Sequence, residues 1–140
     1  MILVDSGPLI AAAISNDRDH RRCVDMSTAL HLNSENLLVP QTVVAEVAYA
    51  IQKLGGTDQE LLFLRAFAEG DLILVDLVPS DLTRIMELVD TYRDFPLGTT
   101  DASVIAIAER LNVAEVATLD HRHFPNVQPR HSHAFIGSPR

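Results

Sequence analysis

The chain has 140 residues, enough for one domain, and its 47% hydrophobic and 21% charged residues are ordinary for a soluble globular protein. Its single cysteine, Cys23, excludes an internal disulfide, and no apolar run approaches the ~20 residues of a membrane-spanning helix. The net charge of −8 argues against a protein that coats nucleic acid, unless several acids bind divalent cations that reverse the local sign. Because the N-terminus lacks the basic start of a secretion signal, we expect a cytoplasmic protein without membrane association, folded as one domain over residues 1–140.

Short apolar runs alternate with segments of helical periodicity along the chain. Pro8, preceded by Ser6 and Gly7, is typical of a helix start, and Gly55 with Gly56 is typical of a helix end. In chain order, the predicted elements are a strand at 1–5, helices at 8–14 and 19–32, a strand at 37–40, helices at 42–54 and 57–68, a buried strand at 72–78, helices at 79–93 and 99–111, and a strand at 113–119.

This alternation is typical of a parallel sheet that is covered by helices on both faces. We therefore predict an α/β fold with three layers, α/β/α, around a central parallel sheet of four to five strands, with an edge strand at 133–136 as the fifth. In open sheets of this kind, ligands bind beyond the carboxyl ends of the strands. Functional side chains are therefore expected where strands end and helices begin.

Four acids lie at such positions. Asp5 follows the first strand and Asp120 the last, while Glu46 and Asp101 fall in the early turns of helices among apolar neighbours. Each has an ordinary alternative, because an acid after a strand can form a turn, and an acid in an early helical turn can support a cap or interact with the helix dipole. Together, four acids at one sheet edge would repel each other and take up protons in the absence of a cation.

A hard divalent cation with oxygen ligands relieves this repulsion. One or two Mg²⁺ or Mn²⁺ ions on these acids would suit phosphodiester hydrolysis, because they activate water, hold the scissile phosphate and neutralise the leaving oxygen. Ser6, beside Asp5, is a candidate for holding a metal ligand in place. The helix starts after Ser6 and near Thr99 direct backbone N–H groups toward an anion, and Thr100 is a candidate contact to a metal ligand or to the substrate.

The acids occur within four ordered segments, which are Asp5-Ser6-Gly7-Pro8-Leu9, Val44-Ala45-Glu46-Val47, Thr100-Asp101-Ala102-Ser103 and Thr118-Leu119-Asp120-His121-Arg122-His123-Phe124. These segments resemble the blocks of PIN domains, and in detail those of VapC-type toxins from bacterial toxin–antitoxin pairs. The similarity spans nearly the whole chain, and each block falls on the expected element. A single block would be weak evidence for the resemblance, whereas four blocks in the same order within 140 residues make it specific.

The resemblance implies a Mg²⁺- or Mn²⁺-dependent endoribonuclease, the toxin of a type II toxin–antitoxin system. It implies that Asp5, Glu46, Asp101 and Asp120 are the catalytic, metal-binding acids, and that Asp5 and Asp101 contact the metal most directly. Asp94 is either an outer ligand or a turn residue. The resemblance also implies a VapB-type antitoxin, whose C-terminal segment would cover the acidic groove, and a toxin homodimer or an antitoxin-bound hetero-oligomer.

Other interpretations stay open. A PIN-like RNA-binding protein without catalysis, or a nuclease acting on DNA, fits the same acids, because a metal site alone does not read the 2′-hydroxyl. A signalling receiver domain is disfavoured, since adjacent acids after the first strand and a lysine after the last strand are missing. His123 is a candidate contact to RNA phosphate. With three other histidines of the tail it also suggests zinc, which no cysteine cluster supports.

Overall fold

A computed structural model describes residues 1–95 and 97–120 of the chain. Within these residues, four parallel strands form one sheet in the order β3-β2-β1-β4. The strands are β1 (Ile2–Val4), β2 (Leu37–Pro40), β3 (Ile73–Val75) and β4 (Glu115–Ala117). The helices are α1 (Ser6–Ala13), α2 (His20–Leu32), α3 (Gln41–Gly55), α4 (Thr57–Ala68), α5 (Pro79–Thr91) and α6 (Thr99–Leu111).

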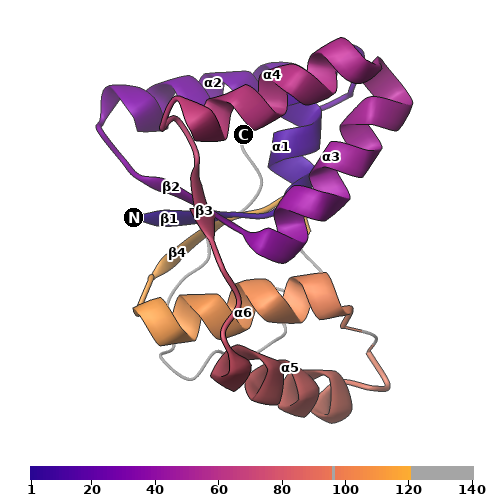
Figure 1. The fold of residues 1–140 in the computed structure, drawn as a ribbon, viewed down its shortest axis with the longest axis vertical. Coiled ribbons are helices and arrows are strands. Elements are labelled where there is room, and N and C mark those ends of the chain that lie inside the picture. The colour runs from indigo at the N-terminus through magenta and orange to yellow at the C-terminus, as the bar shows by residue number, and fades with distance from the viewer. Residues whose placement is uncertain (96, 121–140) are drawn as a thin grey trace.

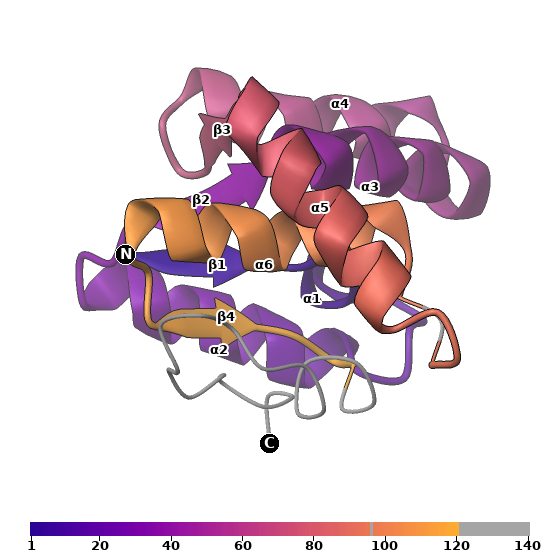
Figure 2. The same cartoon turned by 90° about the horizontal axis from the view of Figure 1, so that it is seen from below.

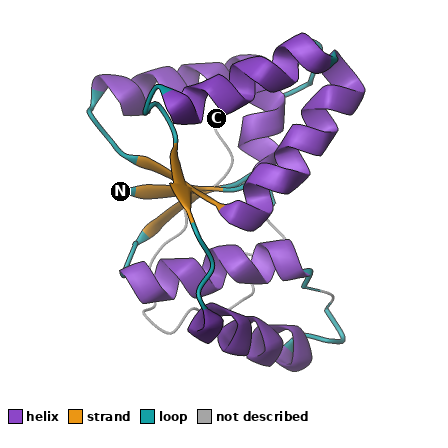
Figure 3. Cartoon of the chain, viewed as in Figure 1, coloured by secondary structure: helices purple, strands orange, loops and turns teal. Residues whose placement is uncertain are grey.

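The helices lie in two layers on opposite faces of the sheet (Figures 1 and 3). Helices α1 to α4 cover one face, and α5 and α6 cover the other. The predicted three-layer α/β/α fold with a parallel sheet is therefore confirmed. The edge strand predicted at 133–136 lies outside the described residues. No helix within the described ranges is both long enough and apolar enough to cross a membrane.

The starts of several helices lie at one edge of the sheet, where the parallel strands end. In the register, Leu3 of the central strand β1 is paired with Leu38 of β2 and with Val116 of β4. Because the strands are parallel, α1 and α3 both begin at the carboxyl edge. Helix α6 runs back toward the start of β4, so its N-terminal end also lies at this edge (Figure 1).

Helix α6 is the most buried helix among the described elements. Residues 102–108 are all buried, because this helix lies between the sheet and α5 (Figure 2). At the carboxyl edge, the first turn of α1 approaches the segment after β4 closely, and a Cβ on Gly7 would lie 3.2 Å from the Cβ of Leu119. Glycine at position 7 therefore permits a close approach between α1 and β4 beside the site.

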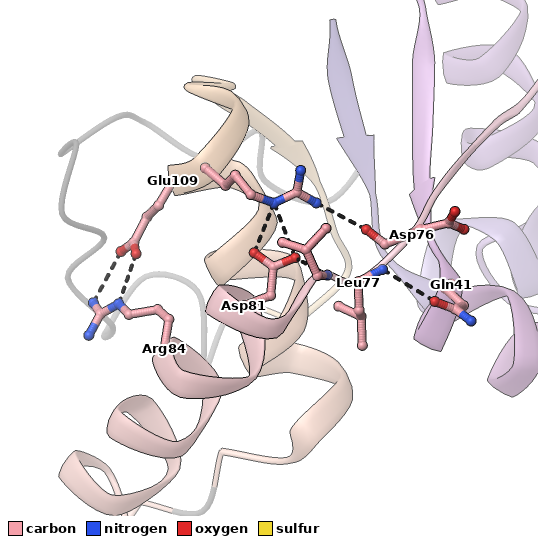
Figure 4. A network of polar contacts seen from close by, with 8 residues as sticks. Gln41, Asp76, Leu77, Asp81, Arg84 and Glu109 are labelled. Atoms are coloured by element: carbon pink, nitrogen blue, oxygen red, sulfur yellow. Dashed lines mark hydrogen bonds and ion pairs between the residues drawn. The ribbon is translucent and has the colours of Figure 1, made fainter.

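Ion pairs join α5 to α6 (Figure 4). Arg110 Nε donates to Asp81 Oδ1 at 2.9 Å, and Arg84 Nε donates to Glu109 Oε1 at 2.8 Å. Asp81 is only 2% exposed, and its other carboxylate oxygen accepts the N–H of Val78 at the start of α5. These contacts fix α5 against α6.

One expectation about the strands is wrong. The predicted buried strand at 72–78 is the short strand β3, and Ile73 and Leu74 are 38% and 51% exposed. The reason is the strand order, which places β3 at an edge with β2 as its one neighbour within the described sheet. Leu72, just before the strand, is buried in the core, and Val75 and Leu77 pack against it while partly exposed.

Candidate functional site

Four acids, Asp5, Glu46, Asp101 and Asp120, stand at the carboxyl edge, and we call them the edge acids. Asp5 lies between β1 and α1, Asp120 follows β4, Glu46 is in the second turn of α3, and Asp101 is in the first turn of α6. Asp5 is only 5% exposed, Asp101 and Asp120 are half-buried, and Glu46 is exposed. The site therefore has a buried acid at its base and more accessible acids around it.

The carboxylate of Asp5 is only partly satisfied by hydrogen bonds. The Thr118 hydroxyl donates to Asp5 Oδ2 at 3.0 Å, whereas Oδ1 is buried without a hydrogen-bond partner in the described structure. The Asp5 backbone N–H donates to Ala117 O at 3.0 Å, which extends the β1–β4 pairing by one residue and fixes the backbone of Asp5. A buried carboxylate oxygen without a partner is costly in a protein, so this atom suggests an additional ligand.

The surroundings of Asp5 disfavour its charged form. The pKa of Asp5 rises from 3.8 to about 6, and burial is the largest cause. The negative charges of Asp101 and Glu46 also contribute to this rise. The backbone N–H of Ser6 and the Thr118 hydroxyl oppose this rise. The structure therefore brings Asp5, Glu46 and Asp101 close enough for their charges to interact.

Thr118 connects the two acids that follow strands β1 and β4. Its hydroxyl donates to Asp5 and accepts the backbone N–H of Asp120 at 2.9 Å, and its side chain is 2% exposed. This role was not predicted from the sequence, although a polar residue at the end of a buried strand is a usable signal. Because one hydroxyl holds both segments, the position of Asp120 depends on that of Asp5.

Ser6 and Thr100 have different positions in the site. The Ser6 hydroxyl donates to Glu46 Oε2 at 2.9 Å, so Ser6 contacts the carboxylate of Glu46. Thr100 lies half-buried in the first turn of α6, and its carbonyl oxygen accepts the Ser103 hydroxyl at 2.6 Å. Both residues therefore stand beside edge acids.

Asp94 and His123 are the remaining residues that were predicted for the site. Asp94 is exposed in the connection between α5 and α6. His123 lies outside the described residues, as do the other histidines of the tail. Cys23 is fully buried in α2.

The edge acids suit a divalent cation without forming a complete cage. Within the described residues, no three Asp, Glu, His or Cys side chains are arranged to hold a metal ion. Mg²⁺ needs only one or two carboxylates, because water and substrate oxygens complete its octahedral shell. The unpartnered Asp5 Oδ1 and the nearby charges of Asp101 and Glu46 therefore fit such an ion, with an adjustment of exposed side chains such as Glu46.

Comparisons with known proteins agree with this fold. A family model described as PIN domain matches residues 2–128. The chain is 30% identical over 131 residues to "Ribonuclease VapC26" from Mycobacterium tuberculosis (strain ATCC 25618 / H37Rv), and the match covers 91% of this chain and 93% of that protein.

Two solved structures share the architecture at low sequence identity. Mycobacterium tuberculosis VapC20, described as a Sarcin-Ricin loop cleaving toxin, aligns with a TM-score of 0.76 and 12% identity, over 86% of this chain and 91% of its own. VapBC2 from Rickettsia felis, bound to a DNA fragment from their promoter, aligns with a TM-score of 0.71 and 17% identity, over 98% of both chains. These two structures support the fold, because the identities are too low to support more.

Proposed function

The chain belongs to the PIN domain family, and we propose that it is a toxin ribonuclease that hydrolyses RNA phosphodiester bonds with Mg²⁺ or Mn²⁺ held by the edge acids. The observation that carries this proposal is Asp5, a buried carboxylate with one unpartnered oxygen, surrounded by further acids at the carboxyl edge of a parallel sheet. The similarity to a ribonuclease over nine-tenths of the chain supports the substrate class.

Asp5 and Asp101 are the residues we assign to the most direct metal contact, with Glu46 and Asp120 completing the acidic site. When bound, Mg²⁺ or Mn²⁺ supplies Lewis-acid polarisation of the phosphate and neutralises charge on the leaving oxygen. Thr118 fixes the orientation of the Asp5 carboxylate through Oδ2, which leaves Oδ1 available. The N-terminal ends of α1 and α6 direct backbone N–H groups toward this edge, where an RNA phosphate would lie.

Two kinds of macromolecular partner belong to the proposal. The first is RNA, and the second is a VapB-type antitoxin, by similarity to VapC-type proteins. Exposed apolar side chains, among them Leu61 and Leu62 of α4 and Leu82 and Met86 of α5, offer the surface chemistry that an antitoxin or a second toxin copy needs. We further propose a cytoplasmic location and a single PIN domain, which the family match over residues 2–128 supports.

The test is cleavage of a labelled single-stranded RNA by purified protein in Mg²⁺ or Mn²⁺, with and without EDTA. Cleavage that EDTA stops, and that Asp5→Asn and Asp101→Asn abolish, is the expected result. Asp58→Asn is the matched control, because Asp58 is also an acid in a first helical turn, that of α4, and is exposed away from the site. Retained cleavage in both Asp5→Asn and Asp101→Asn would overturn the assignment of the site.

The same assay separates the two alternatives. Binding of RNA without cleavage in either metal would indicate an inactive PIN-like binder, and cleavage of the matching DNA strand alone would indicate a DNA nuclease. Growth arrest on expression, relieved by a small protein from the same operon and absent for Asp5→Asn, tests the toxin role.

A further inference from the structure

Two hydroxyl side chains join the helices that carry Glu46 and Asp101. Thr42 Oγ1 in the first turn of α3 lies 2.6 Å from Ser103 Oγ in the first turns of α6. Ser103 Oγ in turn donates to the carbonyl oxygen of Thr100 at 2.6 Å. Ser103 is fully buried and Thr42 is half-buried, so water does not compete freely for these hydrogen bonds.

The donor order in this chain is fixed by the number of available protons. Ser103 has one hydroxyl proton, and the Thr100 carbonyl can only accept it. The proton between Thr42 and Ser103 therefore belongs to Thr42, which donates while Ser103 Oγ accepts. A valine at position 42 keeps the shape of threonine but removes this donor, and a serine keeps the donor.

The position of this contact in the fold gives it a role beyond local packing. Helix α3 belongs to the layer on one face of the sheet and α6 to the layer on the other, and the two helices contact each other past the carboxyl edge. Thr42 lies one helical turn before Glu46, and Ser103 lies two residues after Asp101. The hydroxyl pair is thus a polar link between the two layers, formed close to the acids that they contribute.

We propose that Thr42 and Ser103 are positioning residues, whose hydrogen bond sets the spacing of Glu46 and Asp101 and thereby the affinity of the site for a divalent cation. This inference rests on the proposed function, because it takes the edge acids as the cation site. Neither hydroxyl contacts the cation or the substrate. Contacts that orient metal ligands from outside typically change metal affinity by about 10- to 100-fold.

The experiment measures Mn²⁺ affinity of the purified full chain directly, by calorimetry, with RNA cleavage as a second readout. Thr42→Val is expected to weaken Mn²⁺ binding by about 10-fold and to raise the Mn²⁺ concentration for half-maximal cleavage equally. Thr42→Ser is expected to retain the affinity of the unaltered chain, because it keeps the donor. Thr28→Val on α2 removes a threonine hydroxyl that donates to Val24 O away from the site, and it should leave the affinity unchanged.

Ser103→Ala is the second variant, since it removes the acceptor in a buried place where alanine fits. It should weaken Mn²⁺ binding like Thr42→Val. Unchanged affinity in a folded Thr42→Val or Ser103→Ala chain overturns the positioning role while the proposed function stands. Absence of Mn²⁺ binding in the unaltered chain, or equal binding by Asp5→Asn, instead defeats the metal site and the proposed function with it.

Discussion

The replacement Asp5→Asn is expected to stabilise the metal-free protein near neutral pH. Asp5 is 5% exposed, and its charged form is disfavoured mainly by burial and then by the negative charges of Asp101 and Glu46. Asparagine has nearly the same shape and no charge, so it removes the free-energy cost of a buried charge at this position. Its amide would also place N–H donors near the unpartnered Oδ1 position, beside the two other acids.

The magnitude follows from the pKa of Asp5, which rises from 3.8 in the unfolded chain to about 6 in the folded protein. A rise of this size corresponds to about 3 kcal/mol at 1.36 kcal/mol per pKa unit. The native state holds the Asp5 proton more tightly than the unfolded chain does. The free energy of unfolding is therefore unaffected by this group below pH 3.8, falls as the pH rises to about 6, and stays lower above it.

Urea unfolding of both chains in EDTA measures this effect. The excess stability of Asp5→Asn should grow from about 1 kcal/mol at a pH near 4.5 to about 3 kcal/mol at a pH near 7.5. The negative charges of Asp101 and Glu46 interact with Asp5, so the difference reports the loss of the Asp5 charge together with its effect on these two acids. An Asp5→Asn chain that is less stable than the unaltered chain throughout this pH range would refute the reasoning, because burial of the charge would then not be unfavourable.

Three other perturbations test contacts in the site and between α5 and α6. Thr118→Val removes the hydrogen bonds to Asp5 and Asp120, so it should lower the free energy of unfolding in urea by about 1–3 kcal/mol and abolish RNA cleavage. Addition of Mn²⁺ at 100 times its Kd should stabilise the unaltered chain by about 2.7 kcal/mol, seen as a higher Tm, and should not raise the Tm of Asp5→Asn. Arg110→Met leaves the buried Asp81 without its cation, which should cost about 2 kcal/mol in urea unfolding while cleavage persists at temperatures where the chain is folded.

The helices and strands were predictable because local signals mark their ends. The predicted helix end at Gly55-Gly56 is confirmed, and Gly56 has a φ of 85°, which suits glycine. Helix α1 begins at Ser6, two residues before the predicted start at Pro8. The burial of residues 72–78 was not predictable, because an apolar run does not say whether its strand is central or at an edge.

The candidate site was predictable only in its acids. Asp5 and Asp120 follow strands, so the rule that parallel strands end at one edge places them together without coordinates. The hydroxyl contacts join residues far apart in sequence, with separations of 113 positions for Asp5 and Thr118 and 61 for Thr42 and Ser103. The position of Thr118 at the end of a buried strand is a local signal, but the partners of these hydroxyls required the packed structure.

The backbone geometry explains why the Asp5 carboxylate is buried although burial disfavours its charge. Its N–H continues the β1–β4 pairing to Ala117, and Gly7 allows α1 to close over the end of β4 immediately afterwards. The side chain is therefore buried by the geometry of the strand-to-helix turn. Near neutral pH, the charged and buried carboxylate lowers the free energy of unfolding by roughly 3 kcal/mol, and the packing of the core must offset this loss. A cation bound at the unpartnered oxygen would offset this cost. The burial that destabilises the metal-free fold therefore also strengthens cation binding at the proposed site.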